Sequence, residues 1–466
     1  MFKKQSWRIT AAASLLMTTP IIAQVADSLE APSRLPPEPR PLVDSLDQSP
    51  TEPMRMEPIE PFATDANGTL PQVELSANVL SVEYYEQTAL ASNPAVAEAA
   101  ANLEAAKWRC YQARLRNNPS AGYTASEVGN EGQAGQQGFY VQQTVTPRRK
   151  RWSRIDVAAR EVEIASQQLA IQQQRVLTDV RRRFIAVVIA QTRIDTMQRL
   201  LEVSTKAADS AQRLFASGET PKADYLQTRL DADRMRLELL SARQQLDRNW
   251  RSLNAVAGIR NSGPAQPLTA DIDNVVHFIS YDEALPALLQ ASPEVAKALA
   301  NIQRARSEVH RQRMEVIPDV TANVSVQYDY ATQYTVTGIQ AGMPLPILDR
   351  NQGNIGSACS QLTAAQQQLE RLELRLQQDL AAAHADYANA YQRVLEYQKG
   401  LLPSSKETRD LVVRAFQQGE IGFLQLLNAQ RTFFQVSLDY LDELENYWAR
   451  SYEIDGMLLT GSLDQD

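Results

Sequence analysis

Beyond its N-terminal segment, the 466-residue sequence has no apolar run close to the roughly 18 residues that a membrane-spanning helix needs. If the exported chain crosses a membrane, it must therefore do so with strands. Histidine and cysteine are also scarce. The three histidines are isolated from one another, which excludes the usual spacing of a metal site. The two cysteines, Cys110 and Cys359, are expected to be buried as small apolar residues, although export would permit a disulfide.

The sequence also lacks the features of a nucleic-acid-binding protein and of an enzyme. The formal net charge is −8 and no large basic block is present, so nucleic acid is not an expected partner. No Ser/His/Asp, Cys/His or paired-carboxylate constellation is found, and acidic residues are scattered along polar helical segments. We expect no enzymatic activity, no metal and no cofactor.

The N-terminus has the pattern of a secretory signal. Lys3, Lys4 and Arg8 precede a mostly apolar stretch, which predicts a signal peptide at residues 1–23. Residues 24–77 hold ten prolines and no hydrophobic periodicity, which predicts a disordered, proline-rich arm. The remainder is low in glycine, with 18 in the whole chain, and rich in Ala, Gln, Leu and Arg, which indicates long helices.

Apolar and polar residues alternate from Val320 to Tyr330, as in a strand with one apolar face and one polar face. Its expected hairpin partner is 334–343, and weaker candidates lie at 121–126 and 139–146. The length and alternation suit membrane strands. Four prolines mark the strand ends: Pro119, Pro147, Pro318 and Pro346.

Long segments of helical pattern surround these strands. The first copy of the pattern predicts helices at 81–116, 148–216 and 223–257, with a break at Gly218 and Pro221. The second predicts helices at 353–417 and 424–459. Pro403 should kink the former, because proline removes a backbone donor and clashes with the preceding turn.

The chain contains a long internal repeat. A shift of 199 residues superimposes the prolines at both strand ends, for example Pro119 on Pro318 and Pro147 on Pro346. Two residues further, at a shift of 201, the segment RLFASGE (213–219) aligns with RAFQQGE (414–420). We therefore expect two structural repeats, 78–268 and 269–466, that form one elongated fold. Because open strand edges in lipid leave backbone groups unpaired, four strands must be completed by strands from further copies of the chain.

This duplicated layout, LPILDRNQG (345–353) and RAFQQGEIGFLQLLNAQRTFFQ (414–435) resemble the TolC-type outer-membrane efflux proteins, nearest to the heavy-metal (cobalt–zinc–cadmium) subgroup. The resemblance implies a mainly α fold with a transmembrane β-barrel part. In a homotrimer, each chain would give four strands to a shared 12-stranded barrel and its helices to a long periplasmic α-barrel. It also implies outer-membrane lipid, a periplasmic adaptor and an inner-membrane pump as partners of a passive channel.

The resemblance assigns a periplasmic gate to the two helix turns. Asp224 matches an acid that helps to tie the family's closed gate. Phe416 and Ile421 replace a tyrosine and an arginine, and Gln425 and Asn428 replace a pair of pore-lining aspartates. The hydrogen bonds and salt bridges that hold the family's gate closed are thus largely missing from this sequence. We therefore expect a looser or hydrophobic closure of the gate.

The same turns are the expected site of adaptor docking. The candidate residues are Leu214, Phe215, Gly218 and Glu219 in the first repeat and Phe416, Gly419 and Glu420 in the second. The glycines also suit positive φ at helix ends, so capping alone would explain them.

Three alternatives remain open from the sequence. One is a conduit for type I protein secretion, which shares the fold, and another is a non-conducting coiled-coil scaffold of the cell envelope. The third concerns the basic run at residues 148–151 beside Trp152, which suits either a junction near a lipid surface or a solvated helix start.

Overall fold

The computed structural model describes residues 80–464, apart from 130–131, 133, 276–277 and 419. The expected signal peptide at 1–23 and the proline-rich arm at 24–77 lie outside the described residues. All the described residues belong to the unit formed by residues 76–466.

The order of elements is the same in both halves of this unit. The first half contains α1 (Val82–Ser92), α2 (Pro94–Arg114), β1 (Ser120–Ser126), β2 (Gln136–Val145), α3 (Arg148–Ala216) and α4 (Lys222–Val256). The second contains α5 (Tyr281–Ala291), α6 (Pro293–Met314), β3 (Val320–Asp329), β4 (Tyr334–Gly342), α7 (Gln352–Glu396), the π-helical turn η2 (Tyr397–Leu401), α8 (Leu402–Gln417) and α9 (Phe423–Asp455). The duplicated helix–strand–strand–helix–helix order is therefore confirmed.

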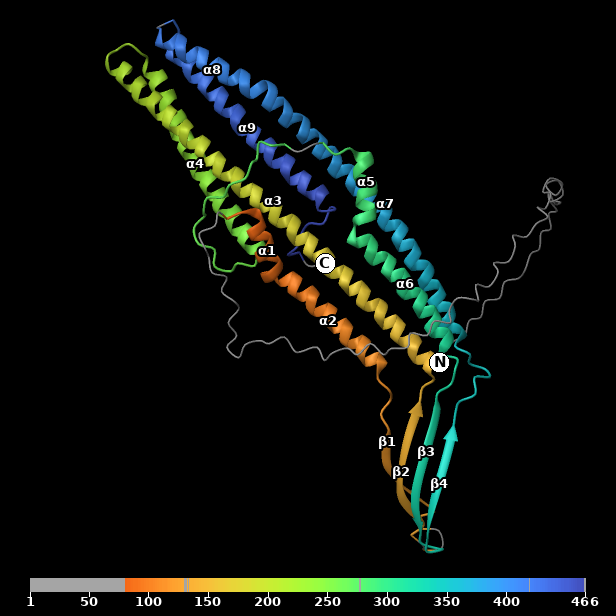
Figure 1. The fold of residues 1–466 in the computed structure, drawn as a ribbon. Coiled ribbons are helices and arrows are strands. Elements are labelled where there is room, and N and C mark those ends of the chain that lie inside the picture. Colours follow the sequence, from red (N-terminus) through yellow and green to blue (C-terminus); the bar gives the residue numbers. More distant parts are fainter. Residues whose placement is uncertain (1–79, 130–131, 133, 276–277, 419, 465–466) are drawn as a thin grey trace, which may run out of the picture. The chain divides into compact units, whose positions relative to one another are not determined.

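The four strands form one antiparallel sheet in the order β1-β2-β3-β4. The two hairpins are joined through β2 and β3, whose register runs from Gln136 opposite Asp329 to Val145 opposite Val320. Consequently β1 and β4 are the edges, and each has a strand on only one side among the described residues. The strands lie at one end of the unit, and the α3–α4 and α8–α9 turns lie at the other (Figure 1).

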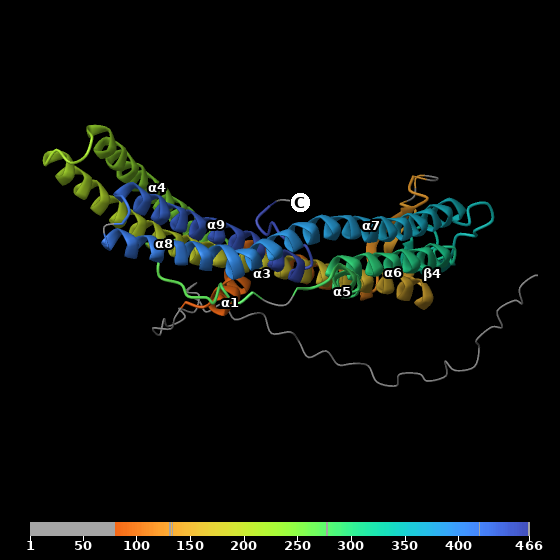
Figure 2. The same cartoon turned by 90° about the horizontal axis from the view of Figure 1, so that it is seen from above.

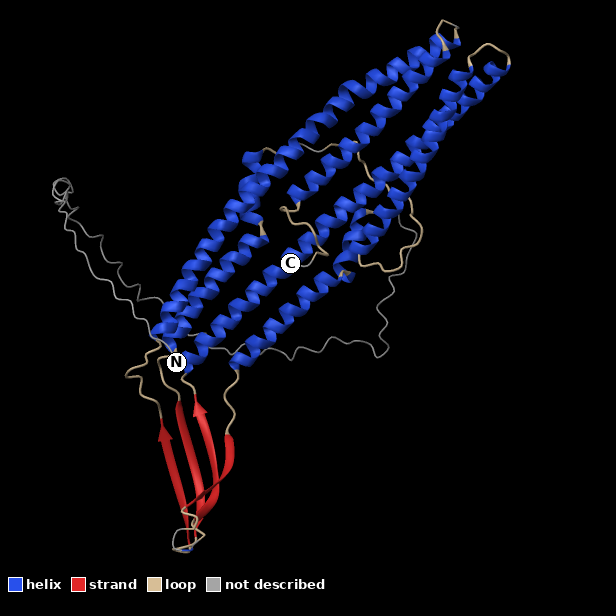
Figure 3. Ribbon diagram, turned by 180° about the vertical axis from the view of Figure 1, so that it is seen from behind, coloured by secondary structure: helices blue, strands red, loops and turns tan. Residues whose placement is uncertain are grey.

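One face of the sheet carries the apolar side chains. A cross-strand row runs through Ala121, Val141, Val324 and Ile339, one residue from each strand. Along β3 the apolar residues are exposed and the polar residues between them are half-buried. This is the pattern of faces that the alternation in the sequence predicts. Figure 3 shows the strands set apart from the helices.

The expected single helix at 81–116 is wrong, because the chain breaks at Asn93. The Asn93 side chain is buried; it accepts the amide of Ala95 at 2.8 Å and donates to the carbonyl of Val256 at 2.8 Å. Asn93 thus caps α2, with Pro94 in the first helical position, where its missing N–H is harmless. The repeat has the same break at Ser292 and Pro293.

The expected distortion near Pro403 takes the form of a π-helical turn. α7 passes into η2, and α8 then begins with Pro403 in its first turn. A wider turn removes the clash between the proline ring and the carbonyl one turn earlier. Buried residues of α3 and α7 correspond at a shift of 200, as in Val176 with Leu376, whereas the tips correspond at 201. One extra residue is accommodated here.

The largest core cluster lies midway along the helices, where α1, α3, α4, α7 and α9 meet. Tyr85 packs edge-on against Phe184 and Trp250, with ring centroids 6.0 Å and 6.5 Å away. The linker between the repeats is held by two indole donors: Trp250 Nε1 binds the Gly263 carbonyl and Trp448 Nε1 binds the Ile272 carbonyl, both at 2.9 Å. A view from above shows the two helix turns again at the end away from the sheet (Figure 2).

Two further expectations concern single features of the chain. Cys110 is buried as expected, but Cys359 is exposed, so the expectation was wrong for that residue in the single chain; both are free thiols. Among the residues that the structure describes, none of the helices combines the length and apolarity required to cross a membrane.

Candidate functional site

The turn between α3 and α4 is closed by backbone hydrogen bonds, and the Ser217 hydroxyl adds a bond to the Leu214 carbonyl at 3.0 Å. The Glu219 amide donates to the Leu214 carbonyl at 2.9 Å, and the Gly218 amide donates to the Phe215 carbonyl at 3.1 Å. These two bonds form a Schellman cap, which needs a left-handed residue at its centre. Gly218 supplies it with φ +81, and a Cβ there would meet nothing within 4 Å. The glycine is therefore required by backbone conformation and not by crowding.

The turn between α8 and α9 has one of these two bonds among the described residues. The Glu420 amide donates to the Ala415 carbonyl at 3.0 Å, the counterpart of the bond from Glu219. Gly419, the counterpart of Gly218 in the repeat, lies outside the described residues. Both turns thus share one backbone hydrogen bond, from the residue after the glycine to the carbonyl five residues earlier, and they lie at the same end of the unit.

The docking candidates of the first turn lie on its surface. Leu214 is half-buried, while Glu219 is exposed. Phe215 stacks on Tyr225 across the turn, with centroids 5.8 Å apart and planes 5° from parallel. This ring pair joins α3 to α4 and stiffens the turn. In the second turn Phe416 and Glu420 are exposed.

The gate candidates are distributed over both turns. Asp224 is exposed in the first turn of α4, and Gln425 and Asn428 are exposed in the first turns of α9. Ile421 is half-buried. Among the described residues, no hydrogen bond or ion pair joins the side chains of Asp224, Gln425 and Asn428 to the opposite turn, so the structure brings them to one end without linking them.

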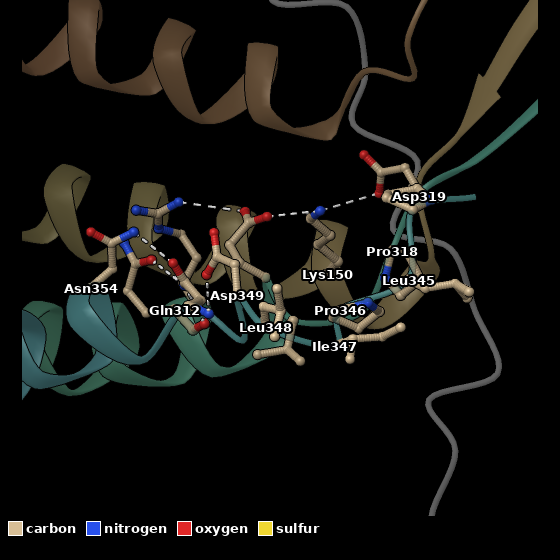
Figure 4. A pocket seen from close by; sticks show the side chains of 15 residues that line it. Lys150, Gln312, Pro318, Asp319, Leu345, Pro346, Ile347, Leu348, Asp349 and Asn354 are labelled. Atoms are coloured by element: carbon tan, nitrogen blue, oxygen red, sulfur yellow. Dashed lines mark hydrogen bonds and ion pairs between the residues drawn. The ribbon is translucent and has the colours of Figure 1, made fainter. Parts of the chain in front are cut away.

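A second polar site, at the junction between sheet and helices, was not predicted. Lys150 in the first turn of α3 is buried and lies between Glu315 at 2.8 Å and Asp319 at 3.3 Å (Figure 4). Glu315 also accepts from Arg154 at 2.9 Å and lies 3.6 Å from Arg311. A solvated helix start is therefore wrong for Lys150, although Arg148 and Arg149 are exposed.

This ion cluster shifts the titration of Glu315. Burial alone would raise the pKa of the Glu315 carboxyl, but hydrogen bonds from Lys150 and Arg154, together with their positive charges, more than offset it. Its pKa therefore lies below the ordinary value of 4.5. The carboxylate stays charged and ties α3 to the end of α6.

The four prolines lie in the connections between strands and helices. Pro147 is the N-cap of α3, and Pro318 lies shortly before β3, between the two acids of the ion cluster, Glu315 and Asp319. On the second side, Pro346 lies in a loop that borders a hollow of about 1040 Å³. Asn351 at φ +60 ends this loop, and its Nδ2 donates to both the backbone and the side-chain oxygen of Gln312, at 2.8 Å and 2.9 Å. The DRNQG segment is thus a hydrogen-bonded start of α7.

The sequence carried only a faint signal for the junction cluster. Lys150 and Glu315 are 165 residues apart, and nothing in the local pattern marks either as buried. The strand-end prolines, which place the two segments at the same level, were the usable clue. Among residues 80–464 as far as they are described, no group of three or more His, Cys, Asp or Glu could hold a metal ion.

Comparison with protein families gives one result that covers most of the chain. The family model described as "Outer membrane efflux protein" matches residues 86–259 and 284–455, one stretch in each repeat. Among curated proteins, the cobalt-zinc-cadmium resistance protein CzcC of Cupriavidus metallidurans is 26% identical over 383 residues. That match covers 82% of this chain and 91% of CzcC.

Solved structures share the fold. The structure of CusC has a TM-score of 0.67 at 15% identity and covers 84% of this chain and 97% of its own. The open state of the Neisseria gonorrhoeae MtrE outer membrane channel has a TM-score of 0.66 at 16% identity, covering 82% of this chain and 89% of its own. The Campylobacter jejuni CmeC outer membrane channel has a TM-score of 0.66 at 12% identity, covering 82% and 87%.

Proposed function

Because the chain belongs to the outer membrane efflux protein family, we propose that it is the outer-membrane channel of a tripartite efflux system and carries substrate passively from the periplasm to the exterior. Its location is the outer membrane, and the helices extend into the periplasm.

The observation that carries this proposal is the sheet with an exposed apolar face and two unpaired edges. The apolar row through Val141 and Val324 suits contact with lipid, and the polar residues between suit a wet interior. In lipid the edges β1 and β4 require hydrogen-bonding partners. A second copy of the chain supplies them when its β1 pairs with β4 of the first.

We propose that three copies close the ring, giving a 12-stranded barrel above a tunnel of helices. The mass of the purified protein in detergent checks this. A trimer is expected, of chains lighter than the 52.0 kDa full sequence by the predicted signal peptide, and a stable monomer that still conducts would contradict it.

The two capped turns are the proposed contact with a periplasmic adaptor, through which an inner-membrane pump is engaged. The two turns of each chain, which share a backbone hydrogen bond, would offer a trimer six similar positions around its tip. Leu214, Phe215 and Glu219 of the first turn, and Phe416 and Glu420 of the second, are the side chains available there.

A loose gate follows from the side chains at these turns. Gln425 and Asn428 carry no charge, so neither a salt-bridged closure nor a strongly cation-selective constriction is expected. The conductance of the isolated protein in a planar bilayer tests this. We expect an open or readily opened channel, and a persistently low conductance would contradict the loose gate.

The name of CzcC favours divalent metal ions as the substrate over drugs. Deletion of the gene should raise sensitivity to cobalt, zinc and cadmium, and the wild-type gene should restore resistance. A strain with unchanged metal sensitivity that instead loses a secreted protein would support the alternative of a type I secretion conduit.

A further inference from the structure

The first repeat contains a strongly basic hollow at its junction between sheet and helices. This hollow of about 550 Å³ lies between the end of α2, the end of β2 and the start of α3. Four arginines line it, and no acidic residue is among its lining residues: Arg116, Arg148, Arg151 and Arg154. We propose that it is an oxyanion site that holds the phosphate of a phospholipid headgroup in the periplasmic leaflet of the outer membrane.

Most of the positive charge in this hollow has no acidic partner among the described residues. Arg154 pairs with Glu315, but among the described residues Arg116, Arg148 and Arg151 have no ion pair and no hydrogen-bonded partner for their side chains. The corresponding hollow of the second repeat is different, because acidic residues there accompany Lys150 and Arg311. Only the first repeat therefore has an excess of cations that a bound anion would neutralise.

Donors without acceptors converge on the same hollow. α3 starts there, its N-cap Pro147 provides no side-chain cap, and its first amides are left for another acceptor. Basic side chains are disfavoured at a helix N-terminus, whereas an anion is favoured. The Oγ1 of Thr146 is buried and has no hydrogen-bond partner among the described residues. Guanidinium groups, helix amides and a hydroxyl together suit a phosphate oxyanion.

The walls of the hollow are held in place. The Gln143 side-chain amide donates to the Asn117 carbonyl at 2.9 Å and to the Thr144 carbonyl at 3.1 Å. This joins the connection after α2 to the end of β2, so the space between them is a built feature of the junction.

The position of the hollow favours a lipid over other sources of phosphate. It begins where the apolar strand face ends, at the exposed Val145. Trp108, Tyr111 and Trp152, which flank it on α2 and α3, are more than half exposed, as interfacial aromatic residues are in membrane proteins. The inference rests on the outer-membrane location of the chain and not on the efflux activity.

The test counts lipids on the purified, delipidated protein by native mass spectrometry. Phosphatidylglycerol, diacylglycerol and inorganic phosphate are added in separate arms. The double variant Arg148→Gln/Arg151→Gln removes two cations of the hollow. The matched control Arg243→Gln/Arg260→Gln removes two exposed arginines far from the strands. A third variant, Thr146→Val, removes only the orphan hydroxyl.

Wild type and the control should bind phosphatidylglycerol and not diacylglycerol. The double variant should bind it at least about tenfold more weakly, since each charge-assisted hydrogen bond contributes more than a neutral one. Thr146→Val should give a smaller loss in the same direction. Equal binding by all variants would overturn the proposal.

Two other outcomes would also overturn the lipid assignment. If inorganic phosphate displaces the lipid at equal concentration, the site serves free phosphate. If the double variant loses its oligomeric state at unchanged lipid count, and Asp349→Asn does the same, the occupant is the carboxylate of a neighbouring copy. Bilayer conductance of the wild-type protein tests the proposed channel separately, because a channel can conduct with or without this lipid.

Discussion

The two repeats end their long helices in the same way but begin them differently. At the tips, the bond from Glu219 to Leu214 has its counterpart in the bond from Glu420 to Ala415, at 2.9 Å and 3.0 Å. At the junctions, α3 starts directly after Pro147, whereas α7 starts only at Gln352, after a loop and a left-handed turn.

The difference follows from the neighbours that each repeat has. The start of α3 packs against α6 of the same chain, and Lys150 is buried between the acids at the end of that helix. The start of α7 packs on α6 as well, but its other side is exposed among the described residues. A duplicated chain thus keeps the backbone that both copies present at the tip and diverges where the copies meet unlike partners.

The largest expected effect comes from breaking the buried junction. Lys150→Met removes the cation of Asp319 and leaves Glu315 with its arginine partners only, and it should destabilise the protein by on the order of 3 kcal/mol, because breaking a buried ion pair is costly. Arg350→Met is the control, since Arg350 is the exposed basic residue just before the start of α7 in the other repeat. Thermal melting in detergent compares the two, and equal losses would remove the distinction between the junctions.

The second-largest effect is expected at the turn between α3 and α4, where Gly218 forms the cap. Gly218→Val forces a β-branched residue into φ +81 and should cost about 1–2 kcal/mol locally, together with a loss of efflux. Gly422→Ala in the second turn is the control, because Gly422 has φ −76 and open space around it. Efflux and hydrogen exchange of the tip amides report the result. An active Gly218→Val variant would show that the cap does not matter for docking.

A smaller effect is expected on the pH dependence of stability, and it arises from the ion cluster at the start of α3. Because the folded-state pKa of Glu315 is depressed, its contribution to stability is present above pH 4.5 and is lost as the pH falls through the folded-state pKa. The melting temperature should therefore fall as the pH is lowered from 4.5 through the folded-state pKa of Glu315. Lys150→Met should flatten the dependence, and an unchanged profile in that variant would contradict the assignment to this cluster.

The smallest effect is expected at the π-helical turn. Deleting Gly400 together with Pro403→Ala removes the extra residue and the reason for it, so α7 and α8 should form one continuous helix in the register of α3. The melting temperature should stay close to that of wild type. Pro403→Ala alone is the control, and a large loss in the deletion variant would show that the turn has a role of its own.

The periodic parts of this fold could be predicted from the sequence. α3 was expected over its whole length, and β3 and β4 end within one residue of the expected limits, because strand alternation and helical pattern are local signals. The break at Asn93 was missed although Asn-Pro is a start signal, since the surrounding alanines favour a continuous helix.

The candidate site was predicted unevenly for the same reason. The tip turns were visible in the Gly and Pro residues that interrupt the helices, and Gly218 lies where the pattern placed it. The burial of Lys150 could not be foreseen, because its partners come from the other repeat. The roles of Asp224, Gln425 and Asn428 remain predictions, since the proposed gate would be formed between chains of the trimer.

The two free edges of the sheet have a genetic consequence. One protomer with a defective edge strand leaves one junction of the barrel unpaired, and the intact protomers cannot compensate, because a closed barrel needs every junction between subunits. If such a variant is expressed together with an equal amount of wild type and the subunits mix at random, only about one trimer in eight contains three intact chains. An edge variant in β1 or β4 should therefore be dominant over the wild-type gene, whereas a null allele should be recessive.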